Sequence, residues 1–287
     1  MNSPVDLRQA VRNLNSLPAM PVIAQKLMAL DLESEEGERQ MMLLISQDPT
    51  ISAKIVGLSN SPLLGASRKA STVKDAAMLL GMTRVKSVAT GIAVMSLVSK
   101  PIGRFDPQEL WLHNLSVAFA MLPVVRAMPA KLRPKDDMIF LAGMLHDIGY
   151  FALAHLDTKL SDDLHTRFVI EPNRQSIEVE RELTDMTHDE LGAELAKHWN
   201  LPGEIVSVLR YHHSPDAPGS ADGQPLARII NITEKLLPQI GLREFVGNHV
   251  TDEEWAALGI DPGKAEEISA QVNEQANEAA QFASSFI

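Results

Sequence analysis

Apolar residues along this chain recur at spacings of three and four residues over long windows, and strict alternation of apolar and polar positions never lasts more than a few residues. This period is that of an amphipathic helix. One such stripe consists of Val22, Ile23, Leu27 and Leu30. The pattern predicts a nearly all-α protein.

Proline, glycine and capping residues divide this pattern into separate helices. The pair Asp48-Pro49 ends one helix and begins the next, because proline disfavours helical backbone in the residue before it and suits the first turn. Ser71 or Thr72 is expected to cap a helix that ends at Gly81. Further helices are expected over residues 109–128, 138–156, 176–199, 203–211 and 225–237, and from 263 towards Phe286.

Residues 100–107 contain two prolines and one glycine, which is the composition of a connection rather than of a helix. This segment is the best candidate for a junction between two helical lobes. The sequence therefore predicts an all-α, two-lobed helical bundle with an N-terminal lobe over residues 1–104, a second lobe over 105–245 and a C-terminal helical extension over 246–287.

Composition and charge exclude several classes of function. The 287 residues include no cysteine, so disulfides, thiolate catalysis and cysteine-bound zinc or iron–sulfur centres are excluded. Any transition metal must then be bound by carboxylates and by some of the nine histidines. The formal net charge of -11 repels nucleic-acid phosphates and anionic membrane surfaces. We expect neither general nucleic-acid binding nor membrane binding.

The first residues and the longest apolar stretches indicate where the protein is expected to be located. The first residues mix charged and apolar positions and lack the apolar core of a secretory signal, so the mature protein is expected to begin near Met1. The apolar stretches 88–98 and 115–125 are shorter than the ~20 residues that cross a bilayer. These features predict a cytoplasmic protein.

The most informative chemistry is the run His146-Asp147-Ile148-Gly149, which follows the apolar residues 140–145. Burying an unpaired imidazole and carboxylate is costly, whereas a metal ion would use both as ligands. Upstream, Glu109 and His113 are four residues apart and share one helix face. Together with acids and imidazoles further along the chain, eight candidate metal ligands occur in the order Glu109, His113, His146, Asp147, His188, His212, His213 and Glu234.

Each candidate also has a plain structural interpretation. His146 and Asp147 would form a buried pair in which each is hydrogen-bonded within the bundle. Glu109 and His113 would form a solvated pair on a helix surface. His188 would lie in a first helical turn, His212 and His213 would end a helix, and Glu234 would be an exposed partner of Lys235 or Arg228.

The order and spacing of these residues resemble the HD superfamily, whose members place a histidine, a His-Asp pair and a distal aspartate around metal in a helical bundle. The chain is most similar to the HDOD family, the HD-related output domains, which also have an N-terminal helical lobe. The shared landmarks are Leu17-Pro18-Ala19-Met20-Pro21, Ile45-Ser46-Gln47-Asp48-Pro49, Leu58-Ser59-Asn60-Ser61, Ala76-Ala77-Met78-Leu79-Leu80-Gly81, Trp199-Asn200-Leu201-Pro202 and Tyr211-His212-His213. The resemblance extends from about residue 17 to 237.

This resemblance implies a signalling module, because HDOD members are regarded as regulatory, while the related HD-GYP family hydrolyses cyclic dinucleotides at a centre of two or three metal ions. Seven of the eight positions match the HD-GYP ligands, and Glu234 stands where aspartate is usual. The resemblance thus implies one to three divalent ions of Fe, Mn, Mg or Zn. Tyr150 stands where active HD-GYP enzymes carry a lysine, and the Gly-Tyr-Pro signature is missing, both of which disfavour hydrolysis.

Two functions are therefore expected, of which we favour the first. The chain is a signal-transduction module that acts through contacts with signalling proteins and retains a metal site. The alternative is a metal-dependent phosphohydrolase, similar to a phosphodiesterase, with a phosphorylated or cyclic-dinucleotide ligand. A more distant alternative is a di-iron oxygenase, because some HD-fold enzymes use the same ligands for oxygen chemistry.

Overall fold

The computed structural model describes residues 6–13, 16–61, 69–98, 100–238, 240–242 and 249–284. The regular structure of these residues is helical, apart from an isolated antiparallel bridge between Ile102 and Phe105. The predicted all-α fold is thus confirmed.

The helices of the N-terminal third are short. They are α1 (Leu7–Arg12), α2 (Val22–Met28), α3 (Glu35–Gln47), α4 (Pro49–Ser59), α5 (Val73–Leu80) and α6 (Met82–Met95). The helices that follow are α7 (Pro107–Ala127), α8 (Asp136–Leu145), α9 (Ile148–Leu156), α10 (Thr158–Ile170), α11 (Ser176–Leu183), α12 (His188–His198), α13 (Gly203–Tyr211), α14 (Leu226–Leu236), α15 (Asp252–Ala257) and α16 (Ala265–Ser284).

Several predicted helix boundaries are confirmed. Asp48 caps α4 by accepting hydrogen bonds from the first backbone N–H groups, and Pro49 is the first residue of that helix. Thr72 forms a capping box with Asp75 at the start of α5. Gly81, with φ of 86°, ends α5 and permits the sharp change of direction into α6.

Other predicted helices differ from the structure. The single helix expected over 138–156 is broken into α8 and α9 at the residues His146 and Asp147. The helix expected over 176–199 is likewise two helices, α11 and α12, because Thr184 and Thr187 adopt extended backbone angles. Helices α10 and α15 were not predicted. The expected end of the last helix at Phe286 lies outside the described residues.

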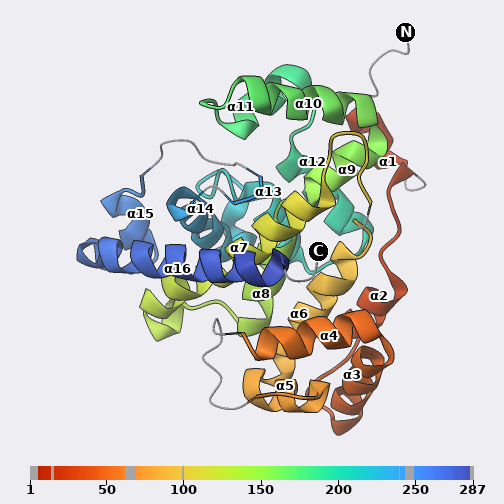
Figure 1. Ribbon diagram of the computed structural model, residues 1–287. Helices are drawn as coiled ribbons and strands as arrows, with labels where there is room; N and C mark the ends of the chain where they lie inside the picture. Colours follow the sequence, from red (N-terminus) through yellow and green to blue (C-terminus); the bar gives the residue numbers. More distant parts are fainter. Residues whose placement is uncertain are drawn as a thin grey trace.

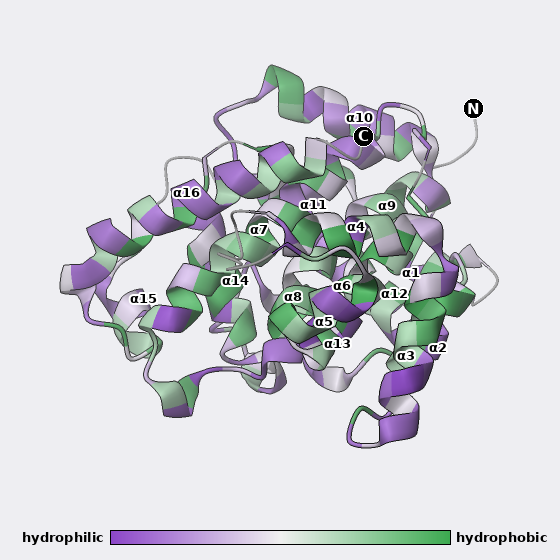
Figure 2. Ribbon diagram, turned by 60° about the horizontal axis from the view of Figure 1, so that its bottom comes forward, coloured by the Kyte–Doolittle hydropathy of each residue, from purple (hydrophilic) through white to green (hydrophobic). Residues whose placement is uncertain are grey.

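Helix α7 lies at the centre of the fold. It packs against α8, α14 and α16, while α12 packs against both α9 and α13. Figure 1 shows α10 and α11 at one end of the molecule and α3 and α5 at the other, with α7, α8 and α9 between them. Figure 2 shows the strongest apolar colouring on central helices such as α8, as expected for a buried core.

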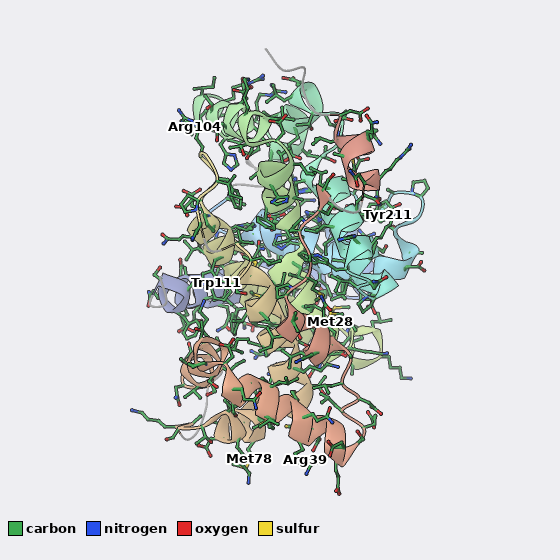
Figure 3. All side chains as sticks on the ribbon, turned by 90° about the vertical axis from the view of Figure 1, so that its right-hand side faces the viewer. Met28, Arg39, Met78, Arg104, Trp111 and Tyr211 are labelled. Carbon is green, nitrogen blue, oxygen red and sulfur yellow. The ribbon has the colours of Figure 1, made fainter. Side chains whose placement is uncertain are left out.

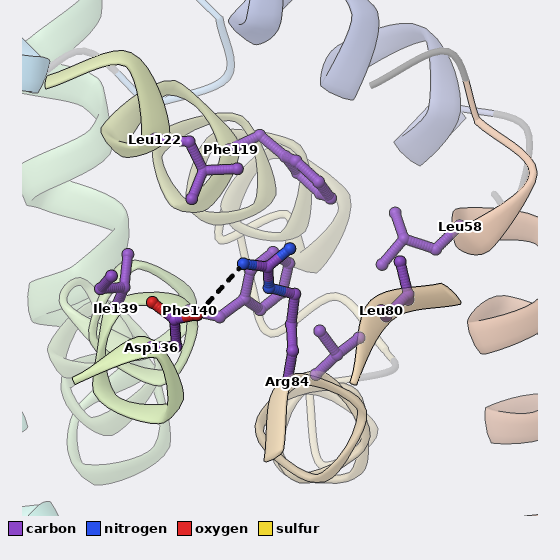
Figure 4. Close-up of a pocket in the computed structure, with 9 residues that line it drawn as sticks. Leu58, Leu80, Arg84, Phe119, Leu122, Asp136, Ile139 and Phe140 are labelled. Carbon is purple, nitrogen blue, oxygen red and sulfur yellow. Dashed lines mark hydrogen bonds and ion pairs between the residues drawn. The ribbon is translucent and has the colours of Figure 1, made fainter. Parts of the chain in front are cut away.

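The N-terminal helices contact this core through apolar side chains and one ion pair (Figure 4). Leu58 and Leu80 face the aromatic ring of Phe119, and Arg84 on α6 forms an ion pair of 3.4 Å with Asp136 on α8. The boundary proposed after residue 104 falls in the turn between α6 and α7, and the one after residue 245 lies outside the described residues. The division into lobes stays a prediction.

Two helical segments are long and apolar enough to cross a membrane, namely Pro107–Ala127 and Asp136–Leu156, and a third would count if the bent pair α5 and α6 formed one span. In the first two segments, 83% and 89% of the apolar window is buried inside the protein. Packing within the fold thus accounts for their hydrophobicity.

Candidate metal centre

The centre is built around the break between α8 and α9. His146 follows the last residue of α8, and Asp147 precedes the first residue of α9 with φ of -101° and ψ of 14°. Gly149 then allows α9 to lie directly against α12, because a Cβ atom at this position would be 1.8 Å from the carbonyl oxygen of His188. The run His-Asp-Ile-Gly thus places two ligands at a helix junction and brings a third helix onto them.

The structure brings seven of the eight candidate ligands together in two groups that share Asp147. Within each group, one ligand atom from every residue lies within 4.8 Å of the others. We call the first group, His113, His146, Asp147 and Glu234, the Glu234 subsite. We call the second group, Asp147, His188, His212 and His213, the His213 subsite.

In the Glu234 subsite, two imidazoles face two carboxylates. The Oε1 atom of Glu234 lies 3.1 Å from Nε2 of His113 and 2.8 Å from Nε2 of His146. The Oδ2 atom of Asp147 lies 3.3 and 3.4 Å from the same two nitrogens. These four side chains are buried and come from α7, α14 and the α8–α9 junction.

In the His213 subsite, three imidazoles gather at the other oxygen of Asp147. Its Oδ1 atom lies 3.3 Å from Nε2 of His188 and 3.5 Å from Nε2 of His212. Nε2 of His188 is also 3.3 Å from Nε2 of His212 and 3.0 Å from Nε2 of His213. His213 is half-buried, while the other members are buried.

Hydrogen bonds from Nδ1, the ring nitrogen that points away from the centre, fix the orientation of these imidazoles. Three of them donate from Nδ1 to a backbone carbonyl, which leaves the lone pair of a neutral ring on Nε2. These pairs are His113 with Ile240 at 3.1 Å, His146 with Gly143 at 2.8 Å, and His212 with Leu209 at 2.8 Å. The nitrogen that would bind a metal therefore points into the centre.

Glu180 orients the imidazole of His188 through its Nδ1 atom. This residue was not among the candidates predicted from the sequence. Its buried carboxylate accepts hydrogen bonds from Nδ1 of His188 at 2.7 Å and from the backbone N–H of His188 at 2.6 Å. The hydroxyl of Tyr150 donates to it at 2.7 Å, and the Tyr150 ring stacks on His188 at 4.3 Å. The available signal was an acid on the buried face of α11, beside Ile177 and Val179.

The charges of the centre call for a cation. Asp147, Glu180 and Glu234 are three buried carboxylates, and in the described part of the chain none of them pairs with lysine or arginine. Neither oxygen of Asp147 receives a hydrogen bond from the described residues. A buried carboxylate in this state is costly unless a positive charge lies beside it.

The pKa values of two residues in the centre reflect the close packing of buried imidazoles and carboxylates. Burial alone would raise the pKa of Asp147, but the facing imidazoles, His146 first, hold it well below its usual range. Burial would also lower the pKa of His113, but Glu234 and Asp147 raise it well above the ordinary value. A protonated His113 would have to lose its Nε2 proton before that atom could hold a metal ion.

The distances fit a transition-metal ion. Bonds of about 2.0–2.1 Å place neighbouring ligands roughly 2.9 Å apart in octahedral geometry and 3.4 Å apart in tetrahedral geometry. The separations between ligand atoms quoted above run from 2.8 to 3.5 Å. Both subsites thus contain ligand contacts of this length, and all the ligand atoms of a subsite lie within 4.8 Å of one another.

Some of the sequence interpretations are corrected here. Glu109 is exposed and belongs to neither subsite, because the first turn of α7 extends beyond the packed centre whereas His113, one turn later, lies inside it. Glu234 is not an exposed partner of Lys235 or Arg228, which pair with Glu254 and Asp216 instead. The assignment of the remaining seven residues as metal ligands stays a prediction.

Fold and site together define an all-helical protein with clustered histidines and carboxylates. The family model described as the HDOD domain matches residues 17–215. The chain belongs to the HDOD family. The match ends before Glu234, so this ligand lies outside the matched residues.

Relatives with similar sequences or folds agree with this. An uncharacterized protein of Treponema pallidum is 23% identical over 203 residues, which are 69% of this chain but only 39% of that protein. A crystal structure of an HDOD domain protein of unknown function from Geobacter sulfurreducens has a TM-score of 0.77 at 22% identity, covering 98% of this chain and 99% of that one.

A protein of Marinobacter aquaeolei, provisionally named a signal transduction protein, has a TM-score of 0.76 at 22% identity. The match covers this whole chain and 62% of that one. A protein of Shewanella amazonensis, provisionally named a metal-dependent phosphohydrolase, has a TM-score of 0.63 at 19% identity and covers 96% of this chain and 97% of that one. At these identities the likeness shows the fold.

Replacing Glu180 by Gln should weaken metal binding at the His213 subsite. The amide removes the negative charge that fixes the Nδ1 proton of His188, and loss of such an outer partner typically lowers metal affinity about 10–100-fold. Competition titration with a coloured chelator measures the change. The control is Glu178→Gln, an exposed acid on the same helix, and unchanged affinity in Glu180→Gln would contradict this role.

Proposed function

We propose that this chain is a regulatory module of signal transduction that acts through contacts with partner proteins and contains a structural pair of divalent metal ions. The HDOD family assignment and the fold shared with the Marinobacter protein support the signalling role. The metal pair would join helices that are distant in sequence, namely α7, α12, α13, α14 and the α8–α9 junction.

One observation carries this proposal. The carboxylate of Asp147 is buried, its two oxygens accept no hydrogen bond within the described residues, and each faces the Nε2 atoms of two imidazoles. A carboxylate in this state would suit a ligand shared by the two subsites. A simple hydrogen-bonded pair of His146 and Asp147 would have left these oxygens satisfied.

The donor set favours certain metals. Each subsite combines imidazole nitrogens with carboxylate oxygens, a set that suits iron, zinc and manganese, whereas magnesium prefers oxygen ligands and retained waters. When bound, a divalent ion supplies the positive charge that three buried carboxylates lack. The hydrogen bonds from the opposite ring nitrogens, Nδ1, hold these imidazoles in place.

A phosphohydrolase remains the second candidate, supported by a single feature. A cavity of about 510 Å³ borders the half-buried His213 and is also lined by Asn231 and Lys235. It would admit a small phosphodiester to the edge of the His213 subsite. Against this, Lys235 pairs with Glu254, and Tyr150 supports His188 where an active HD-GYP enzyme would offer a lysine to the substrate.

Metal removal tests the proposal. An ion at a hundredfold excess over its Kd stabilises the folded state by about 2.7 kcal/mol, so chelation should lower Tm by roughly 5–10 °C. The metal content of protein purified without chelator, measured by elemental analysis, should approach two ions per chain. Less than one ion per chain, or a Tm unaffected by chelation, would contradict a structural metal pair.

The same metal-loaded sample distinguishes the two functions. We expect no hydrolysis of bis(4-nitrophenyl) phosphate above the level of the His146→Ala variant. Turnover that requires the ions and disappears in His146→Ala would replace the structural role by the phosphohydrolase role.

A further inference from the structure

A second cavity, of about 540 Å³, lies between the N-terminal helices and the start of α7, away from the residues of the metal centre. Its apolar walls include Ile51 of α4, Ile92 and Met95 of α6, and Trp111 of α7. Trp111, labelled in Figure 3, lies on α7 just above the N-terminal helices. The volume is within the range of about 300–1,000 Å³ of small-molecule sites.

Lys54 lines this cavity, and its ammonium group forms no ion pair with a carboxylate of the described residues. Its Nζ atom lies 4.1 Å from the centroid of the Trp111 ring. Among the residues with described positions, no carboxylate lies within ion-pair distance of Nζ and no acceptor forms a hydrogen bond with it. Burial lowers the pKa of Lys54, and no opposing effect of an acid offsets it. An anion beside Nζ would remove this cost.

Trp111 adds a second unsatisfied donor next to the cation. Its side chain is 7% exposed, and its indole Nε1–H has no acceptor in the described part of the protein. A buried indole N–H usually finds a partner. Lys54 and Trp111 thus bring two donors together beside the apolar residues of the wall.

Two acids that line the same cavity restrict the negative charge that a ligand can carry. Asp48 accepts backbone hydrogen bonds at the start of α4, and Asp106 accepts one at the start of α7. These carboxylates are held in place by their helices and would repel a polyphosphate. One anionic group at Lys54, joined to an apolar body, fits both the cation and the two acids.

We propose that this cavity binds a small organic monoanion, a carboxylate with an apolar chain or ring. The carboxylate accepts a charge-assisted hydrogen bond from Nζ of Lys54, and the apolar part packs against Ile92 and Trp111. The site does not depend on the metal pair. Trp111 is nevertheless two residues from His113, so that one helix borders both the cavity and the Glu234 subsite.

Three probes with the same apolar chain and different head groups test the proposal. Octanoate, octan-1-ol and octylamine are titrated calorimetrically into the full chain, and the titrations are repeated after chelation because a carboxylate also binds metal ions. Octanoate should bind at least about 10-fold more tightly than octan-1-ol, with or without metal, and octylamine should bind most weakly. Equal affinities, binding lost on chelation, or no octanoate binding up to ~10 mM would overturn the proposal.

Matched variants locate the binding. Lys54→Met keeps the length and apolar stem of the side chain and should reduce octanoate affinity about 10-fold or more, while Lys54→Arg should retain the preference for octanoate. The control Lys74→Met changes an exposed lysine of α5 and should leave binding unchanged. Circular dichroism verifies that each variant is folded. Unchanged binding in Lys54→Met would refute the assignment to this cavity.

Discussion

The Asp147→Asn variant is expected to lose both metal ions, with an apparent affinity at least about 100-fold below that of the parent protein. Asp147 offers one oxygen to each subsite, so a single substitution removes a charged ligand from both. An uncharged amide is a much weaker ligand for a divalent ion and does not bridge two of them. Elemental analysis after gel filtration measures the result.

Variants of single-subsite residues separate this bridging role from general damage. Glu234→Gln and His213→Gln should each lose about one ion, and Asp163→Asn, at an exposed acid, should lose none. In chelator, Asp147→Asn should unfold at a lower temperature than the parent, because the facing imidazoles stabilise the charged Asp147 carboxylate in the folded protein. Retention of one ion by Asp147→Asn would show that Asp147 does not bridge.

The second large effect is expected from Gly149→Ala. The added methyl group would lie 1.8 Å from the carbonyl oxygen of His188 and 2.9 Å from the backbone nitrogen of Gly192. Backbone atoms cannot rotate away as a side chain would, so α9 and α12 must separate. We expect a loss of about 3 kcal/mol in the free energy of unfolding, measured by urea denaturation, and loss of the ion in the His213 subsite.

Gly203→Ala provides the matched control. Gly203 begins α13 and has open space where a Cβ atom would lie. Alanine there should leave stability unchanged or raise it by a few tenths of a kcal/mol to about 1 kcal/mol. If Gly149→Ala were as stable as Gly203→Ala, the close contact between α9 and α12 would not be required for the fold.

The sequence predicted those features of the fold that depend on neighbouring residues. The helix boundary at Asp48-Pro49, the cap at Thr72, which was one of two candidates, and the stop at Gly81 depend on local backbone chemistry and agree with the prediction. The break at His146 and Asp147 was missed because the apolar period continues across it. Tertiary contacts with α7, α12 and α14 hold these two residues at the helix junction, and the local pattern contains no such information.

The sequence predicted most of the residues of the site but not how they are arranged in space. The eight candidates came from family likeness and from spacing within a helix, and seven of them cluster, whereas Glu109 is exposed and lies outside both groups. Nothing in the order of residues indicates that Asp147 lies between two groups, since this depends on how five parts of the chain pack. Glu180 was missed because a single acid in an amphipathic helix resembles an ordinary surface residue.

The spread of ligands along the chain has a consequence for biosynthesis. His113 and Glu234 are 121 residues apart, and Glu234 is the last of the predicted ligands to leave the ribosome. The residues of the His213 subsite all emerge earlier, so an ion bound there would not have to wait for Glu234. The Glu234 subsite would be complete only after Glu234 has emerged, so of two ions bound during synthesis the one in this subsite would be the later.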